Sequence, residues 1–349
     1  MTRDTATQNP RTALVIGATG SFGGHAAAAL IRHGWRVRAL ARDPDAASAR
    51  SGPRMPIDWV KGDALVAADV IAAAEGVDVI VHGANPPGYK NWRGLAIPML
   101  AATIAAARAQ GARIVLPGNV YNYAPASGAM IAETAPQAPV TRKGKVRVEM
   151  ERMLADAAPE GAKALVLRAG DFFGPAAPNS CFSWLTSRRG GRVRSVSAPG
   201  PVDVGHAFAY LPDMAETMAR LLDREAELAD FDSFHFAGHW QARGDGMVSS
   251  IRRVTGDATI RVKPFPYALL FVLSPFVEMF RELLEMRYLW NQPIGLDDAK
   301  LRAFLGEVPF TTFDAAVRET LADMDCLGEP GVSNSAWKGT EVDARARAA

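Results

Sequence analysis

A glycine-rich segment that directly follows a short apolar run constrains the fold of this chain more than any other feature. The run is Ala13–Ile16, and the segment after it reads Gly17-Ala-Thr-Gly-Ser-Phe-Gly23. Gly17 suits a tight turn, Gly20 lets the backbone approach a pyrophosphate, and Gly23 lets a helix pack closely on a sheet. The N-terminus of that helix favours an anion. We therefore predict a dinucleotide-binding turn here, with an ordinary strand-to-helix turn as the alternative.

Short apolar runs rich in β-branched residues alternate with alanine-rich helical segments as far as Ala169. This alternation is typical of right-handed crossovers that build a parallel sheet. We predict strands at residues 13–16, 36–41, 57–61, 77–82, 113–116 and 164–168. The predicted fold class is α/β, a doubly wound parallel sheet of the Rossmann type with a smaller C-terminal lobe.

The alternation weakens after Phe172, where prolines and the pair Gly190-Gly191 interrupt the pattern. We predict a flexible leader at residues 1–11 and an NAD(P)-binding domain at 12–175. Residues 176–328 are assigned to a substrate-binding lobe with elements that return to the core. Residues 329–349 are rich in small and polar residues, which predicts a disordered tail.

Further motifs along the chain resemble those of the short-chain dehydrogenase/reductase superfamily, in its extended and atypical, epimerase/dehydratase-like branch. The glycine spacing matches that branch, and the resemblance covers about residues 13–324. Its other motifs are Gly62-Asp63, His82-Gly-Ala-Asn85, Lys145 with Glu149, Arg168-Ala-Gly-Asp-Phe-Phe-Gly-Pro175 and Tyr210-Leu-Pro-Asp-Met-Ala215. The resemblance implies a protein that binds a nicotinamide dinucleotide and a small molecule. A cytoplasmic location is predicted from the two isolated cysteines, Cys181 and Cys326.

The second predicted strand bears on the choice of cofactor. Arg38 and Arg42 are four residues apart on the same side of this strand, and a guanidinium suits the 2′-phosphate of NADP. Asp43 leaves NAD open. Asp63 is expected to bind the adenine amino group. The predicted cofactor residues are Gly17, Thr19, Gly20, Ser21, Phe22, Gly23, Arg38, Arg42, Asp63, Ala64, Gly83, Ala84, Asn85 and Lys145.

The catalytic centre departs from the pattern of the superfamily. The resemblance implies a Tyr-x-x-x-Lys pair, in which the lysine lowers the pKa of the tyrosine. Lys145 matches the lysine, but Thr141 stands where the tyrosine is expected. A threonine hydroxyl can orient a substrate oxygen, although it is a poor general acid.

The serine that the superfamily carries near the end of the fifth strand is also missing, because Pro117 occupies its position. Tyr121 and Asn119 follow the same strand, at the carboxyl edge where ligands bind in such folds. We predict that Tyr121 transfers the proton and that Asn119 donates to a developing oxyanion. The alternative makes Tyr121 a packing residue. The predicted catalytic set is Lys145, Tyr121, Asn119 and Thr141.

Polar and aromatic residues after the last main strand are predicted to contact substrate. They are Asp171, Phe172, Asn179, Ser180, Trp184 and His206. The alternative to substrate contact is a loop-capping role for Asp171 and a structural role for His206. The apolar segment 265–289 favours a hydrophobic or aromatic carbonyl substrate, or the wall of a homodimer.

Composition excludes several other classes of function. The formal net charge is +2 without a basic block, which argues against nucleic acid as a partner. No His, Asp and Glu cluster has the spacing of a metal site. Cys181 and Cys326 are isolated, which favours a reducing compartment. The N-terminus does not resemble a secretory signal, and no apolar stretch has the length of a transmembrane segment.

The main functional hypothesis is an NADP-dependent oxidoreductase of the carbonyl reductase or dehydrogenase type. A second hypothesis is an NAD(P)(H)-binding protein that senses redox state without catalysis. The third is an NAD(P)-dependent epimerase or isomerase, which the absent tyrosine weakens because epimerisation moves a proton in both directions.

Overall fold

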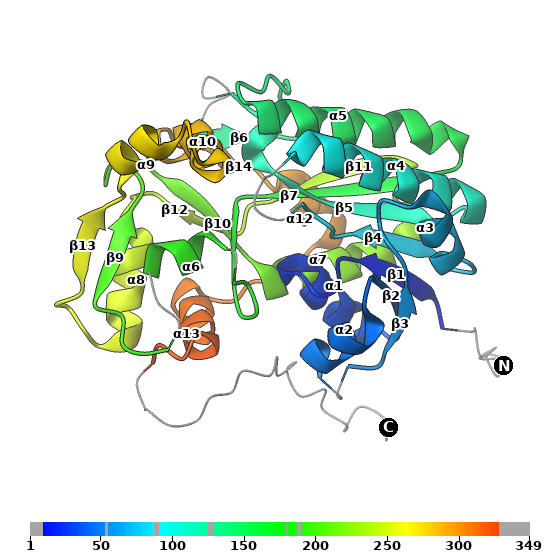
Figure 1. Cartoon of the computed structure of the whole chain (residues 1–349), viewed down its shortest axis with the longest axis horizontal. Helices are drawn as coiled ribbons and strands as arrows, with labels where there is room; N and C mark the ends of the chain where they lie inside the picture. The colour runs from blue at the N-terminus through cyan, green and yellow to red at the C-terminus, as the bar shows by residue number, and fades with distance from the viewer. Residues whose placement is uncertain are drawn as a thin grey trace.

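A parallel sheet forms the centre of the molecule, with the strand order β11-β7-β5-β4-β1-β2-β3 (Figure 1). The computed structural model describes residues 10–52, 55–86, 91–124, 129–178, 180–186 and 190–327. The seven strands are β1 (Thr12–Ile16), β2 (Arg36–Ala41), β3 (Ile57–Lys61), β4 (Val79–His82), β5 (Arg113–Asn119), β7 (Ala164–Ala169) and β11 (Phe231–Phe236). The predicted α/β fold and all of the predicted strands are confirmed, whereas β11 was not predicted.

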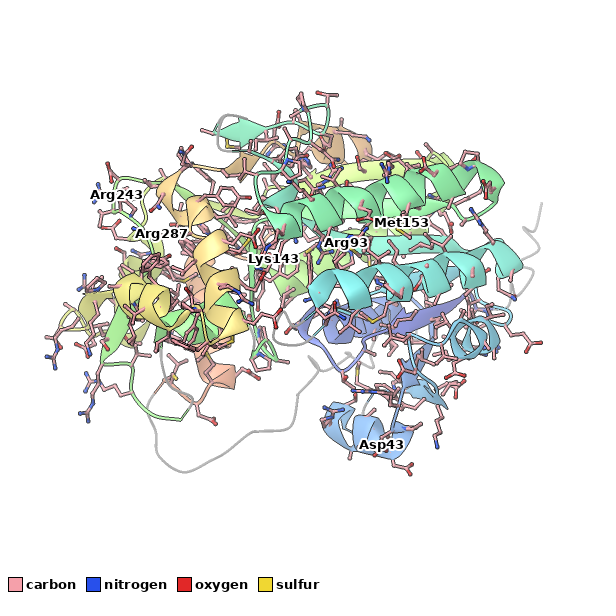
Figure 2. The ribbon with its side chains drawn as sticks, turned by 45° about the horizontal axis from the view of Figure 1, so that its top comes forward. Asp43, Arg93, Lys143, Met153, Arg243 and Arg287 are labelled. Atoms are coloured by element: carbon pink, nitrogen blue, oxygen red, sulfur yellow. The ribbon has the colours of Figure 1, made fainter. Side chains whose placement is uncertain are left out.

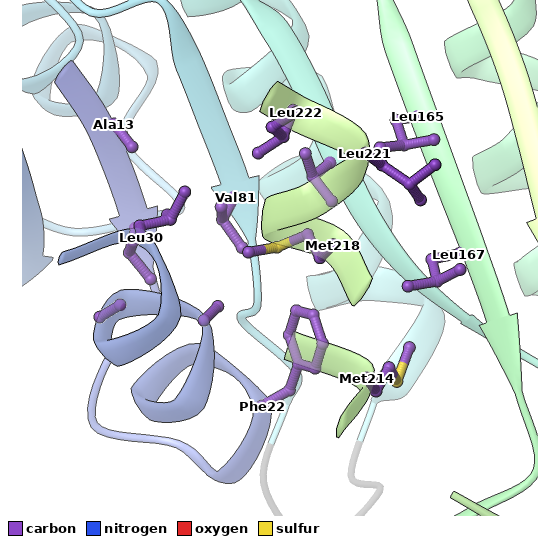
Figure 3. Close-up of a cluster of buried hydrophobic side chains, with 14 of the residues drawn as sticks. Ala13, Phe22, Leu30, Val81, Leu165, Leu167, Met214, Met218, Leu221 and Leu222 are labelled. Carbon is purple, nitrogen blue, oxygen red and sulfur yellow. The ribbon is translucent and has the colours of Figure 1, made fainter. Parts of the chain in front are cut away.

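Helices cover both faces of this sheet, because successive side chains of a strand point to opposite faces. Ala13 and Val15 join one buried cluster, and Leu14 and Ile16 join another. The first face is covered by α1 (Ser21–Arg32) and α7 (Leu211–Asp223), and Figure 3 shows side chains of both helices beside those of β4 and β7. The second face is covered by α3 (Ala67–Ala73), α4 (Trp92–Gln110) and α5 (Arg142–Ala157).

Alanine explains why α7 lies so close to α1 although the two helices are far apart in the sequence. Ala29 of α1 meets Ala215 and Ala219 of α7 in a small buried cluster. Side chains of this size let two helix backbones approach closely. The chain after residue 176 therefore returns to complete the first layer, and α12 (Ala299–Leu305) also packs beside β11.

A separate aromatic core holds the C-terminal lobe together. Phe173 packs against Phe182, Phe208 and Tyr210. The lobe contains a three-stranded sheet of β8 (Asp171–Phe173), β10 (His206–Tyr210) and β12 (His239–Gln241), and a pair of β9 (Ser195–Ala198) with β13 (Arg261–Pro264). Its helices α6 (Cys181–Thr186), α8 (Gly246–Thr255) and α13 (Phe313–Asp323) surround this core.

α2 (Pro44–Ser51) packs beside β2 and β3 at one edge of the central sheet (Figure 1). The remaining elements are β6 (Met130–Ile131), α9 (Tyr267–Leu273), α10 (Glu278–Glu285), α11 (Tyr288–Asn291) and β14 (Gly295–Leu296). β6 and β14 pair in parallel. Cys326 is buried in the lobe core, which fits a small apolar role.

Some predicted features cannot be located. The predicted leader, apart from residues 10 and 11, and the predicted tail lie outside the described residues. Among the residues that are described, no helix is long and apolar enough to cross a membrane.

Candidate nucleotide and active site

The glycine loop is packed so tightly that two of its positions have no room for a side chain. Gly17 has φ +86°, and a Cβ there would lie 2.7 Å from the backbone nitrogen of Ala84. A Cβ on Gly23 would lie 2.2 Å from the carbonyl oxygen of Gly17. The turn is closed by a hydrogen bond from the Gly20 N–H to that same carbonyl, at 2.9 Å. The loop therefore rests directly on the backbone that follows β4.

A cleft of about 110 Å³ opens beside this loop. The N-terminus of α1 faces an anion favourably, because its first N–H groups have no partners within the helix. Arg50, at the end of α2, adds a positive charge to the cleft. The cleft is lined by Ala18, Thr19, Gly20, Ser21, Gly24, Arg50, Ser51, Met55 and Ala176. These residues fit the pyrophosphate of a dinucleotide.

Of the other predicted cofactor residues, those that follow β4 lie against the glycine loop or α4, and the rest contact their own surroundings. Gly83 and Ala84 contact the glycine loop, and the Asn85 side chain accepts a hydrogen bond from the Trp92 indole at 3.0 Å. Asp63 turns its carboxylate to the Leu65 N–H at 2.9 Å. Ala64 packs on the second core cluster, and Phe22 is buried in the first.

Arg38 does not reach the cleft. Its guanidinium donates to the carbonyl oxygens of Ala73 and Glu75, at 2.7 and 2.9 Å, beyond the C-terminal end of α3. That end of α3 lies at the amino edge of the parallel sheet. Arg42, four residues further along the chain, lies about 13 Å away at the carboxyl edge. The expectation that both arginines face one phosphate overlooked this distance.

Asp43 is committed to the start of α2. Its carboxylate accepts a hydrogen bond from the Ala46 N–H at 3.0 Å and so caps that helix. Arg42 and Arg50, at the start and end of this segment, are both exposed.

Lys145 points away from the interior of the molecule. It is exposed on α5, and its neighbour Glu149 on the same face forms an ion pair with Arg93 at 2.7 Å. The inward face of α5 carries Lys143, Arg147 and Glu151 instead, as buried or half-buried residues. Positions two residues apart on a helix differ by about 200° in direction. Lys145 and the inward-facing side chains of α5 therefore lie on different faces of the helix, and the role of Lys145 stays a prediction.

Arg147 reaches the strand end where the resemblance implies a catalytic serine. Its Nη1 donates to the Pro117 carbonyl oxygen at 3.3 Å, and its guanidinium lies over the Trp92 ring at 5.2 Å. Burial lowers the pKa of the His82 imidazole to about 3, and the positive charge of Arg147 contributes a smaller part of the shift. His82 is therefore neutral, and its Nδ1 lies 2.8 Å from the Thr103 hydroxyl oxygen, which itself donates to the Met99 carbonyl oxygen at 3.1 Å.

Lys143 is held by the C-terminal part of the chain. Its ammonium group is 2 % exposed and lies 2.5 Å from the carboxylate of Glu282 on α10. It also donates to the Glu282 carbonyl oxygen at 2.9 Å. Burial lowers the pKa of Lys143, and Glu282 opposes that shift. Figure 2 shows Lys143 where the start of α5 meets the C-terminal helices.

Thr141 has a structural role at the same helix end. Its hydroxyl oxygen accepts a hydrogen bond from the Gly144 N–H at 2.9 Å, which makes it the N-cap of α5. The residue is 4 % exposed. The hydroxyl that replaces the expected tyrosine is thus already bonded to the backbone.

A buried polar network, which the sequence did not reveal, connects α5 to the sheet. Glu151 accepts hydrogen bonds from Arg168 on β7, the shortest at 2.6 Å, and from the Asn122 amide at 2.9 Å. The Tyr123 hydroxyl lies 2.9 Å from Nε2 of His235, and Arg168 lies 3.2 Å from the same nitrogen. The i, i+4 spacing of Arg147 and Glu151 was the signal that could have identified this face.

The network fixes the short helix η2 (Val120–Asn122), on which Tyr121 lies. The Asn119 side-chain oxygen accepts a hydrogen bond from the Tyr121 N–H at 3.0 Å, so its carbonyl oxygen caps the turn. Tyr121 is half-buried against a cluster that includes Met286 and Leu289. Asn119 and Tyr121 therefore both lie at the carboxyl edge of β5.

Two predicted substrate residues, 35 positions apart in the chain, form a pair. Nε2 of His206 lies 2.8 Å from the Asp171 carboxylate, and the imidazole stacks on Trp290 with ring centroids 3.7 Å apart. Phe172 stacks on Phe22 at 6.4 Å, which joins β8 to the helix after the glycine loop.

The remaining predicted substrate residues are less informative. Ser180 is buried and bonded within its own loop. Asn179 lies outside the described residues, as do the side chains of Trp184 and Cys181. Across the described ranges, no His, Cys, Asp and Glu group has the geometry of a metal site.

Comparison with known proteins identifies the family and the fold. The model of the NAD dependent epimerase/dehydratase family matches residues 13–235. An epimerase candidate from Burkholderia cenocepacia J2315 superimposes with a TM-score of 0.71 at 21 % identity, covering 91 % of this chain and 99 % of its own. A comparison with curated proteins gave no significant match.

Sugar-nucleotide epimerases have the same fold. The UDP-glucuronic acid 4-epimerase from Bacillus cereus, in complex with UDP-glucuronic acid and NAD, has a TM-score of 0.71 at 15 % identity and covers 90 % of this chain and 98 % of its own. The UDP-glucose 4-epimerase from Bifidobacterium longum, in complex with NAD+ and UDP, has a TM-score of 0.68 at 14 % identity, with 89 % and 97 % coverage.

Proposed function

This chain belongs to the NAD dependent epimerase/dehydratase family, and we propose that it uses a nicotinamide dinucleotide to oxidise and re-reduce a hydroxyl-bearing carbon of a small molecule. The glycine loop carries this proposal. The positive φ at Gly17 and the close packing at Gly23 are those expected of a dinucleotide-binding turn, and they bring backbone N–H groups to a cleft that fits a pyrophosphate.

Epimerisation is favoured over net carbonyl reduction. The family description names epimerases and dehydratases, and of the two neighbouring 4-epimerases one is in complex with UDP-glucuronic acid and NAD and the other with UDP and NAD+. These relatives make a sugar nucleotide the first substrate class to test, ahead of the hydrophobic carbonyl compound suggested by residues 265–289. The cofactor supplies hydride acceptance and return, so an epimerase leaves no net change in its redox state.

Two groups are proposed for proton transfer. Tyr121 lies at the carboxyl edge of β5 and carries a phenol, the same acid as the tyrosine that Thr141 replaces. The Asp171–His206 pair is the second proposal, since a carboxylate 2.8 Å from an imidazole orients it. Arg147 is proposed to take the positioning role of the expected lysine, because it is the inward cation beside Pro117.

The proposed preference for NADP now depends on Arg42 and Arg50 and no longer on Arg38. Arg50 lines the cleft, and Arg42 follows the strand end at which the 2′-substituent of the ribose is recognised in this fold. Arg42→Ala is expected to weaken NADPH binding about tenfold without affecting NADH. Arg38→Ala is the matched control and is expected to leave the ratio of the two affinities unchanged. Equal affinities of the wild-type protein for NADPH and NADH would contradict the preference.

Nucleotide titration tests the site itself. A Cβ at Gly20 would meet only the Gly17 carbonyl oxygen, at 3.2 Å, so Gly20→Val is expected to fold with a small adjustment. The new side chain projects at the cleft and is expected to abolish binding of NAD(H) and NADP(H). Unchanged binding with an unchanged circular dichroism spectrum would reduce the loop to a simple turn.

Activity distinguishes the enzyme from a redox sensor. UDP-sugars are incubated with the protein loaded with NAD and, in parallel, with NADP, and the sugar stereochemistry is followed by NMR. Tyr121→Phe is expected to lower turnover roughly a hundredfold, and His206→Gln is the parallel variant for the second proposal. Cofactor binding without turnover of any sugar nucleotide or carbonyl compound would favour the sensor.

A further inference from the structure

Large apolar side chains project into solvent from α9 and the turn after it. Phe276 is 87 % exposed, Phe271 72 %, Val272 66 % and Leu269 57 %. Such a concentration within eight consecutive residues is unusual, because soluble proteins rarely expose contiguous apolar patches. We refer to Leu269, Phe271, Val272 and Phe276 as the α9 patch.

The α9 patch is held rigidly in this position. Leu270, between two of its members, is buried, and the Tyr267 hydroxyl donates to the Pro199 carbonyl oxygen at 2.9 Å. Glu282 of the adjoining α10 is tied to Lys143 of α5. The exposure of the patch thus follows from a fixed helical hairpin at the periphery of the lobe (Figure 1).

Cations border the α9 patch. Arg261 and Lys263 are exposed on β13, which leads into α9, and Arg287 stacks on Tyr267 at 4.5 Å. Two acidic residues of α10, Glu282 and Glu285, face Arg142 and Lys143. The third, Glu278, follows the patch by two residues and is outnumbered by the four cations Arg261, Lys263, Arg281 and Arg287. The surroundings of the patch therefore carry excess positive charge.

We propose that the α9 patch binds the surface of an anionic phospholipid membrane. A helix of seven residues is about 10 Å long, which suits insertion into the headgroup region and is too short for a span. The bordering cations would then meet lipid phosphates. A two-fold dimer through the same patch would bring two sets of these cations to one interface, so charge favours the membrane over a second copy of the chain.

Vesicle co-sedimentation of the full chain tests the proposal. We expect binding to vesicles of equimolar phosphatidylglycerol and phosphatidylcholine, weak binding to pure phosphatidylcholine, and a decrease with salt. Phe271→Ser/Phe276→Ser is expected to lower the partition coefficient at least roughly tenfold. Arg261→Glu/Lys263→Glu is expected to lower it by about the same factor on anionic vesicles only.

Matched variants separate this effect from general changes of surface. Phe310→Ser removes another phenylalanine that is 65 % exposed, and Arg36→Glu/Arg318→Glu reverses two exposed cations elsewhere. Both are expected to bind as the wild type does. Absence of binding to anionic vesicles would overturn the proposal. So would a wild-type dimer that Phe271→Ser/Phe276→Ser converts to a monomer in sedimentation velocity, because the patch would then join two copies.

Discussion

The glycine loop and the first turns of α5 flank the same carboxyl edge of the sheet, but backbone contacts determine the first and side-chain contacts the second. The loop is made by backbone: Gly17 and Gly23 are required because a Cβ would collide with main-chain atoms. The start of α5 is made by side chains, in which Lys143 is paired with Glu282 and Thr141 caps the helix. The first region tolerates no added atoms at Gly17 and Gly23, whereas the second depends on particular charges and their partners.

The largest expected effect distinguishes two glycines of the loop. Gly23→Val places a Cβ 2.2 Å from the Gly17 carbonyl oxygen, so the turn must open and α1 must move away from β1. We expect loss of nucleotide binding together with a strongly lowered melting temperature, whereas Gly20→Val loses binding alone. Calorimetry and nucleotide titration of both variants provide the comparison. A Gly23→Val protein that melts like the wild type would show that the loop is not tightly packed.

The next largest effect concerns the buried network beneath α5. Arg168→Met leaves the Glu151 carboxylate buried without its partner, which is expected to cost about 3–5 kcal/mol of unfolding free energy. The double variant Glu151→Leu/Arg168→Met is expected to be more stable than Arg168→Met, because no buried charge remains. Urea unfolding of the wild type, the two single variants and the double variant gives the four free energies of a double-mutant cycle. If the losses of the single variants added up to that of the double variant, the two side chains would not interact.

Two lysines on opposite faces of α5 test which face contributes to stability and to nucleotide binding. Lys143→Met removes a buried charged hydrogen bond to Glu282 and is expected to destabilise the protein by about 2–3 kcal/mol. Lys145→Met changes an exposed residue and is expected to alter stability by less than about 0.5 kcal/mol. A large loss of activity or nucleotide affinity in Lys145→Met would restore the original assignment of the motif.

His82 lies between the two regions and gives a pH dependence. The pKa of its imidazole is lowered to about 3 in the folded protein and is about 6.5 in an unfolded chain. The unfolded state therefore binds more protons between these pH values, so stability falls as the pH decreases below 6.5. Between pH 7.5 and pH 5, the unfolding free energy of the wild type is expected to fall by about 2 kcal/mol more than that of His82→Phe. If the unfolding free energies of the wild type and His82→Phe fell equally with pH, this prediction would be wrong.

The smallest effect belongs to the helix cap. Thr141→Val removes the acceptor for the Gly144 N–H while keeping the shape of the side chain, and is expected to cost about 1 kcal/mol. Thr141→Ser keeps the acceptor and is expected to remain near wild-type stability. Equal stability of Thr141→Val and Thr141→Ser would exclude capping as the role of this hydroxyl.

The strands and the glycine loop could be predicted because local chemistry determines them. An apolar run followed by glycines at fixed spacing leaves few alternative conformations. β11 was not recognised because it follows an irregular segment and pairs with β7, about seventy residues earlier in the chain. Its polar members Asp232 and Ser233 also interrupt the apolar pattern that identified the other strands.

The side-chain contacts at the carboxyl edge were less predictable. Arg38 and Arg42 share one side of a strand, but the sequence does not show that α3 ends beside the first of them. Lys145 matched a motif, yet the phase of α5 is set by Val146, Met150 and Leu154, which pack on the sheet. The Asp171–His206 pair was suggested only as two separate residues, because their contact depends on the pairing of β8 with β10.

The contact between Lys143 and Glu282 also affects the order in which the molecule can assemble. The two residues are 139 positions apart, so during synthesis α5 emerges long before the carboxylate that neutralises its buried ammonium group. At about 5–20 residues per second, this delay amounts to roughly 7 to 30 seconds. The first turn of α5 must stay hydrated during that time, and the site at its N-terminus is completed only after α10 has left the ribosome.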